Sequence, residues 1–173
     1  QVEHTVSEEI TNIDLVQSQI LVAEGYPLDS DEINIKSQAD VHCDGYSIQT
    51  RVTTEDPANN FMPDTGEITV ASDVSSHIMG SGIRLDGGNA YTGAVISPYY
   101  DSLLVKAISH DRTFAGAVRK SIRTLQEMRI RGVKTNIPFL INVLHHPTFV
   151  AGKCYTTFIE ETPELFQLTQ SQD

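Results

Sequence analysis

Apolar side chains near the start of the chain fall mostly three and four positions apart. Over residues 7–25 this spacing predicts one amphipathic helix or a pair of short ones. Ser7 is placed to cap the first turn and Gly25 to end the last, because a serine oxygen accepts a backbone N–H and glycine readily adopts the left-handed conformation. The polar residues 26–45 predict a connection.

The hydrophobic period then changes from helical to alternating. Residues 46–54 alternate apolar and polar positions, which predicts a half-buried strand with Arg51 on the same face as Gln49 and Thr53. Turn residues such as Asp-Gly separate further short apolar runs, which predict antiparallel strands. These runs span residues 68–71, 83–85 and 103–108.

Helical spacing returns in the C-terminal half of the chain. With Asp111 or Thr113 as a cap, an apolar stripe predicts a helix that continues to Met128. A second helix is predicted to begin after Asn136 as its cap and to end before Pro147. Because helices come first, strands next and helices last, we expect a segregated α+β fold: an N-terminal helical segment, an antiparallel sheet and C-terminal helices.

Composition and charge narrow the classes of function. The chain has 173 residues, of which 39% are hydrophobic, so it can bury a core, and its apolar runs are too short to cross a bilayer. A net charge of −11 argues against nucleic acid as a partner, since phosphates would be repelled. Cys43 and Cys154 lack a C-x-x-C spacing, which favours packed, free thiols in a reducing compartment.

Two charged positions are candidates for chemistry on small oxyanions. Glu3 and His4 are adjacent, and because neighbours in an extended segment point to opposite sides, we expect only Glu3 to enter a site. From the pattern alone, a solvent-exposed glutamate is the more common outcome. For Arg51, a structural role in a salt bridge to Glu55 is as well supported by the spacing as a role in binding an oxyanion.

Other motifs favour structural roles. His145 and His146 are adjacent in a predicted helix and cannot chelate one metal ion, so we expect no metal site. The glycines between positions 80 and 93 match no phosphate-binding loop. The basic run 129–134 either meets an anionic ligand or satisfies a helix C-terminus, and the second account is favoured because cations are stabilised in a last helical turn.

Longer motifs resemble a known family. Residues 1–16 resemble the closing segment of the biotin carboxylase catalytic domain, in the ATP-grasp superfamily. Within that family, four segments resemble the pyruvate carboxylase branch in particular: residues 51–57, 84–91, 96–102 and 129–138. The resemblance extends to about Phe166 and implies a biotin-dependent ligase.

The resemblance implies roles for residues at the N-terminal edge. Gln1 and Val2 resemble residues that hold bicarbonate, and Glu3 resembles the base that deprotonates bicarbonate for attack on the γ-phosphate of ATP. The product would be carboxyphosphate, whose carbon dioxide is captured by the deprotonated ureido nitrogen of biotin.

It also implies roles further along the chain. Arg51 resembles the arginine that stabilises the biotin enolate, and Asp101 lies in a segment close to the biotin site. Arg84 resembles a residue near the dimer interface.

The domain organisation follows from the same resemblance. Residues 1–30 would be the end of the ATP-grasp catalytic domain, 31–166 the biotin carboxylase C-terminal domain, and 167–173 a polar tail. In the family, the ligands of ATP and magnesium lie mostly upstream of the residue matched by Gln1. We therefore expect the chain to be part of a longer enzyme and inactive by itself.

The implied cofactors and partners belong to that longer enzyme. They are biotin, ATP, magnesium, bicarbonate, the biotin carrier domain, the enzyme's other domains and a further subunit, with acetyl-CoA as a candidate effector for the run 129–134. The intact enzyme would carboxylate pyruvate to oxaloacetate, in the bacterial cytoplasm or the mitochondrial matrix. The alternative is a non-catalytic assembly module that supplies dimer contacts and docks the carrier domain.

Overall fold

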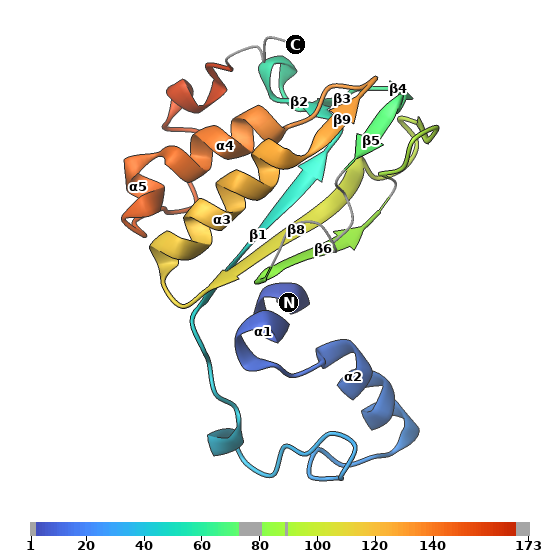
Figure 1. The fold of residues 1–173 in the computed structure, drawn as a ribbon, viewed down its shortest axis with the longest axis vertical. Coiled ribbons are helices and arrows are strands. Elements are labelled where there is room, and N and C mark those ends of the chain that lie inside the picture. The colour runs from blue at the N-terminus through green and yellow to red at the C-terminus, as the bar shows by residue number, and fades with distance from the viewer. Residues whose placement is uncertain (1–2, 73–80, 89, 169–173) are drawn as a thin grey trace.

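The structure, a computed structural model, describes residues 3–72, 81–88 and 90–168 (Figure 1). Its helices are α1 (His4–Thr11), α2 (Leu15–Glu24), α3 (Phe114–Glu127), α4 (Ile137–His145) and α5 (Pro147–Val150), with short 3-10 helices at Gln38–Asp40, Pro57–Asn59 and Pro163–Phe166. Its strands are β1 (Tyr46–Thr53), β2 (Glu55–Asp56), β3 (Met62–Pro63), β4 (Gly66–Glu67), β5 (Val70–Ser72), β6 (Ile83–Gly87), β7 (Val95–Ile96), β8 (Leu103–Asp111) and β9 (Arg129–Arg131).

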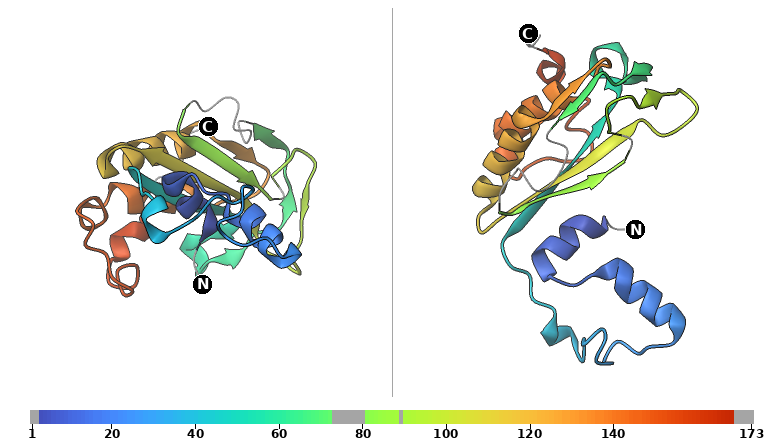
Figure 2. Two further views of the ribbon diagram at one scale, coloured as in Figure 1. Left: turned by 90° about the horizontal axis from the view of Figure 1, so that it is seen from below. Right: turned by 45° about the vertical axis from the view of Figure 1, so that its right-hand side comes forward.

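An antiparallel sheet of three strands, in the order β1-β8-β6, forms the centre of the fold. The helices α3 and α4 cover one of its faces, and α1 lies against the other (Figures 1 and 2). The remaining strands form two-stranded ladders, β2-β3, β4-β7 and β5-β9. Helices before and after an antiparallel sheet confirm the α+β prediction.

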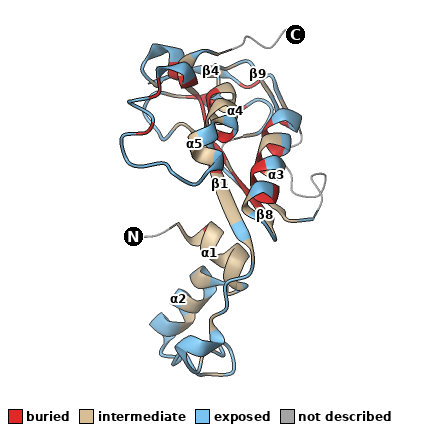
Figure 3. Ribbon diagram, turned by 90° about the vertical axis from the view of Figure 1, so that its left-hand side faces the viewer, coloured by how far each residue is buried: buried red, intermediate tan, exposed pale blue. Residues whose placement is uncertain are grey.

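The core lies between the sheet and α3. Alternation along β1 and β8 places Val52 opposite Val105, and both are fully buried beside Val118 and Leu125 of α3. Figure 3 shows the buried residues gathered in the strands and in α3 and α4, whereas α1 and α2 are mostly half-buried or exposed. Because α1 buries only Thr5 and α2 buries no residue, apolar burial contributes little to their attachment.

The predicted pair of N-terminal helices is present, but it begins earlier than expected. Ser7 lies inside α1, and Glu3 occupies the N-cap position. Thr5, in the first turn of α1, is fully buried and its hydroxyl donates a hydrogen bond to Gln49 of β1. Asp14 caps α2 by accepting a hydrogen bond from the backbone N–H of Gln17, at 2.8 Å. Gly25 ends α2 at a φ of 101°, as predicted.

The C-terminal helices match their predicted positions. Thr113 caps α3 by accepting a hydrogen bond from the Gly116 N–H, and α4 ends before Pro147. In α5 the Nδ1 atom of His146 accepts a hydrogen bond from the backbone N–H of Thr148.

Three further local predictions were wrong. The run at 129–134 does not close a helix, because Met128 is extended and Arg129–Arg131 pair with β5. Thr53 leaves the face of Arg51, since the register shifts after Val52, and it is only 6% exposed. Both cysteines are free, as predicted, but exposed rather than packed.

Among the described residues, no helix is both long and apolar enough to cross a membrane.

Candidate functional site

A row of three charged residues crosses the sheet on the face that carries α1. The antiparallel register places Arg51 of β1 opposite Lys106 of β8, and Lys106 opposite Asp86 of β6. Directly opposed residues of neighbouring strands point to the same side and lie within contact distance. Three positions that are far apart in the sequence therefore form one polar row, Arg51–Lys106–Asp86, which is also called the polar strip below.

Glu3 reaches this strip from the N-cap of α1. Its Oε1 atom lies 3.0 Å from the Lys106 Nζ atom, in an ion pair that is a hydrogen bond. The hydrogen bond from Lys106 lowers the pKa of Glu3 below its ordinary value; hydrogen bonding from Gln49 acts in the same direction, and partial burial opposes it. The Glu3 carboxylate is therefore ionised at neutral pH.

His4 approaches the same strip. Its Nδ1 atom lies 3.3 Å from the Glu3 carboxylate and its Nε2 atom 4.0 Å from Asp86. The expectation that Glu3 and His4 point to opposite sides was wrong, because the extended conformation ends at Glu3 and His4 is already the first residue of α1.

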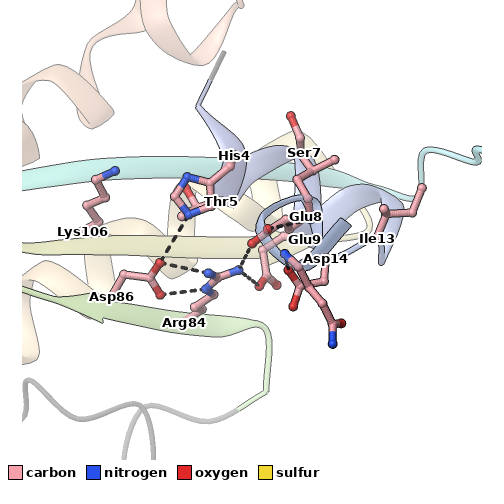
Figure 4. Close-up of polar contacts among 12 residues, drawn as sticks. His4, Thr5, Ser7, Glu8, Glu9, Ile13, Asp14, Arg84, Asp86 and Lys106 are labelled. Carbon is pink, nitrogen blue, oxygen red and sulfur yellow. Dashed lines mark hydrogen bonds and ion pairs between the residues drawn. The ribbon is translucent and has the colours of Figure 1, made fainter. Parts of the chain in front are cut away.

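Polar contacts hold α1 on the sheet (Figure 4). Arg84 of β6 donates hydrogen bonds to both carboxylate oxygens of Asp86, at 2.7 and 2.9 Å, and to Glu8 of α1, at 2.7 Å. Its Nη1 atom also lies 3.7 Å from Glu9. The bond to Asp86 raises the pKa of Arg84 the most, so this guanidinium stays charged. The dimer-interface role of Arg84 stays a prediction, beside these contacts within the chain.

Arg51 and Asp101 lie together, as their common assignment to the biotin site requires. The Arg51 Nη2 atom is 3.6 Å from the Asp101 carboxylate, and the two side chains are 53% and 70% exposed. Glu55, the alternative partner, accepts a hydrogen bond from the Ser102 hydroxyl instead, at 2.7 Å. Because the Arg51–Asp101 pair is exposed and not a close hydrogen bond, it contributes about 1 kcal/mol or less and leaves the guanidinium accessible to a ligand.

Asn136 secures the strand segment that carries Arg51. Its Nδ2 atom donates to the Arg51 carbonyl at 3.0 Å, its Oδ1 atom accepts from the Thr53 N–H at 2.9 Å, and its own N–H donates to the Thr53 carbonyl at 3.2 Å. Asn136 precedes α4 as predicted, but its side chain bonds the edge of β1 and makes no cap. A cleft of about 370 Å³ runs along this edge, with Gln49, Arg51 and Asn136 among the residues that line it.

Replacing Asn136 by alanine should lower the free energy of unfolding by about 2–4 kcal/mol, because it leaves one carbonyl and one N–H of β1 unpaired. Urea titration of the chain followed by circular dichroism measures this. Asn142→Ala is the control, since its side chain donates to carbonyls near a more exposed end of the chain and should cost about 1 kcal/mol. Equal losses in both variants would contradict the special role of Asn136.

The arrangement suits a reaction on small oxyanions. It combines an ionised carboxylate, a lysine that holds it and an accessible guanidinium on one face of a rigid sheet. Lys106 was missed by the sequence analysis, although it is the one charged residue in the apolar run 103–108 and alternation places it on the polar face. Gln1 and Val2, the predicted bicarbonate ligands, lie outside the described residues.

Comparisons with known proteins identify the family. The sequence model described as Biotin carboxylase C-terminal domain matches residues 49–161. The pyruvate carboxylase of Bacillus subtilis is 55% identical over 173 residues, which are all of this chain and 15% of that protein. The chain therefore spans about 15% of the length of this relative.

Solved structures agree in fold. The multifunctional pyruvate carboxylase of Rhizobium etli superposes with a TM-score of 0.93 at 46% identity, over the whole of this chain and 16% of that one. The biotin carboxylase domain of Hydrogenobacter thermophilus 2-oxoglutarate carboxylase, solved as a dimer with MgADP and bicarbonate, gives 0.88 at 39% identity over 98% of this chain and 35% of that one. The chain thus belongs to the biotin carboxylase C-terminal domain family, and along its whole length it is similar to the corresponding region of pyruvate carboxylases.

Proposed function

We propose that this chain forms one wall of the active site of a biotin carboxylase within a pyruvate carboxylase. The intact enzyme would carboxylate biotin with ATP and bicarbonate through carboxyphosphate, and then transfer the carboxyl group to pyruvate to give oxaloacetate. The observation that carries the proposal is the placement of Glu3 and Arg51 on one face of the sheet: Glu3 is bound by Lys106, and Lys106 lies opposite Arg51 in the register of the strands. The similarity to pyruvate carboxylases and to a domain solved with bicarbonate supports it.

In this proposal Glu3 acts as the base. Its carboxylate takes the proton of bicarbonate, and a bicarbonate oxygen then attacks the γ-phosphate of ATP, which gives carboxyphosphate and ADP. Gln1 and Val2 would hold the bicarbonate beside Glu3. A positioned base typically contributes about 10²–10⁴ to a rate, and an ionised side chain is the form this step needs.

Arg51 acts on biotin in the second step. Carboxyphosphate would break down to carbon dioxide and phosphate, and the phosphate would take the proton of the ureido nitrogen. Negative charge would then lie on the ureido oxygen, and the deprotonated nitrogen would capture the carbon dioxide. The Arg51 guanidinium would lie against that oxygen, with Asp101 as the neighbour that orients it. A fixed donor aimed at a developing oxyanion is typically worth about 3–4 kcal/mol in the transition state.

The domain division and the partners are proposals of the same kind. Residues 1–30 would end the ATP-grasp catalytic domain, 31–166 would form the C-terminal domain and 167–173 a tail. ATP and magnesium would be held mostly by residues that precede Gln1, so the isolated chain should neither cleave ATP nor carboxylate biotin. The carrier domain would deliver biotin to Arg51. Acetyl-CoA would act as an effector, with the basic residues 129–134 as a candidate contact.

A role in assembly is the second candidate. Exposed apolar and aromatic side chains precede Asp101 in the sequence, and a docking surface could use them: Tyr91, Val95, Tyr99 and Tyr100. Docking of the carrier domain and catalysis are compatible, because biotin must reach the site on that domain.

The test is an assay of the intact protein that contains this chain. We expect ATP cleavage that depends on bicarbonate, and transfer of labelled carbon from bicarbonate to biotin that depends on ATP. Omission of each substrate in turn is the control. ATP cleavage of equal rate with and without bicarbonate, together with unlabelled biotin, would reject the carboxylase and leave the assembly module.

A further inference from the structure

We propose that Lys106 is a positioning residue for this reaction, which holds the Glu3 carboxylate on the same row of the sheet as Arg51. The inference rests on the proposed function of Glu3 and Arg51. It adds a residue from β8 that contacts neither biotin nor ATP in the scheme above and acts through the carboxylate it binds.

The lysine has a rigid base. β8 is the central strand of the sheet, so both of its edges are hydrogen-bonded, to β1 and to β6. The residues on either side of Lys106 in the chain, Val105 and Ala107, are buried in the core. The Lys106 side chain itself is 22% exposed, so its stem is packed while its ammonium group reaches Glu3.

The neighbouring charges select Glu3 as its partner. Asp86 lies directly across from Lys106, but Arg84 occupies both of its carboxylate oxygens with hydrogen bonds of 2.7 and 2.9 Å. Arg51, on the other side, carries a like charge and repels the ammonium group. The one acidic group that approaches Lys106 within hydrogen-bond distance, among the described residues, is Glu3 at 3.0 Å.

The same contact sets the charge of the carboxylate. The groups that face Glu3 or share its row are Lys106 from β8, Arg51 from β1, Asp86 from β6 and His4 from its own helix. The hydrogen bond from Lys106 is the largest cause of the lowered pKa of Glu3. Without Lys106 this pKa should rise, so the carboxylate would be protonated, and lost as a base, at a higher pH than in the wild type.

The experiment compares Lys106→Met and Lys106→Arg with wild type in the intact enzyme, by the rate of bicarbonate-dependent ATP cleavage from pH 8 down to a pH below the ordinary pKa of glutamate. For Lys106→Met we expect kcat at pH 7 to fall about tenfold, because the base is no longer held in place. The acid limb of the profile should move to higher pH, because the hydrogen bond that lowers the pKa of Glu3 is gone, while the KM for ATP stays within about twofold. Lys106→Arg keeps the charge and should restore most of the rate and the profile.

Lys120→Met is the matched control. Lys120 pairs with Asp111 at 3.0 Å, the same distance as Lys106 and Glu3, but it lies on α3, across the sheet from α1. Its loss should leave the rate and the pH profile unchanged. Thermal melting of each variant shows whether it folds. If Lys106→Met does not fold, Lys106→Gln, which also removes the charge, takes its place in the comparison.

The outcomes separate this inference from the proposed function. If folded Lys106→Met keeps the wild-type rate and acid limb while Glu3→Gln is inactive, Lys106 is no positioning residue and the proposed function stands. A loss of rate with an unmoved acid limb and no rescue by arginine would also overturn the inference. If Glu3→Gln itself keeps the wild-type rate, Glu3 is not the catalytic base and the proposed function is wrong on that point.

Discussion

Replacing Arg51 by glutamine in the intact enzyme should lower the rate of biotin carboxylation by about 10²–10³. The guanidinium is the accessible cation of the row, and glutamine removes the charge that would meet the developing ureido oxyanion. ATP binding should be unchanged, because Arg51 is assigned to biotin and most of the proposed ATP ligands precede Gln1. Transfer of labelled carbon from bicarbonate to free biotin measures the first quantity, and the KM for ATP measures the second.

Arg123→Gln is the matched control for this variant. Arg123 is also an exposed arginine in an ion pair, with Glu127 at 2.7 Å, but it lies on α3 on the other side of the sheet. We expect wild-type carboxylation from it. Wild-type turnover in Arg51→Gln would remove Arg51 from the mechanism, and an equal loss in both variants would point to a general effect of lost surface charge.

Replacing Glu3 by glutamine should lower bicarbonate-dependent ATP cleavage by about 10²–10⁴, the contribution of a positioned general base. Glutamine has nearly the same shape and can still accept a hydrogen bond from Lys106, so the docking of α1 should persist. It cannot take the proton of bicarbonate. The rate of ADP release with and without bicarbonate measures the effect.

The dependence of wild-type stability and activity on pH gives a second test of the role of Glu3. Because its pKa is lowered in the folded chain, its ion pair with Lys106 stabilises the fold above the ordinary pKa of glutamate, and this contribution disappears as the pH falls through the lowered value. The activity that depends on the ionised base should disappear over the same range. Glu9→Gln, on the same helix and 3.7 Å from Arg84, should keep the wild-type rate and profile. If Glu3→Gln cleaves ATP normally, the base is elsewhere.

Much of the fold could be predicted because it depends on local order in the sequence. The alternation of residues 46–54 gave β1 within one residue, and the helical stripe after Thr113 gave α3. The exact start of a helix and the pairing of strands that are distant in the sequence were harder to predict. Ser7 looks like a cap, but α1 already begins at His4 and Glu3 is its N-cap. Residues 129–131 look like a helix end until β5 is known to pair with them.

The site was predictable only in part, for the same reason. Arg51 and Glu3 were found through resemblance, and their roles stay predictions for the assays above. Lys106 was not found, because its importance comes from a partner 103 residues away in the chain. Asn136 was predicted to cap α4, but its side chain instead donates a hydrogen bond to the backbone carbonyl of Arg51 in β1, 85 residues away in the chain.

By itself, the sequence determined the longer helices and the long strands of the central sheet, since periodicity and turn chemistry act between neighbours along the chain. It also determined the family, through long motifs that need no coordinates. Only the tertiary structure decided which charges meet: Arg51, Lys106 and Asp86 form a row because three antiparallel strands pair in one register. A shift of one residue would turn these side chains to the opposite face, so their meeting depends on the packing of the whole sheet.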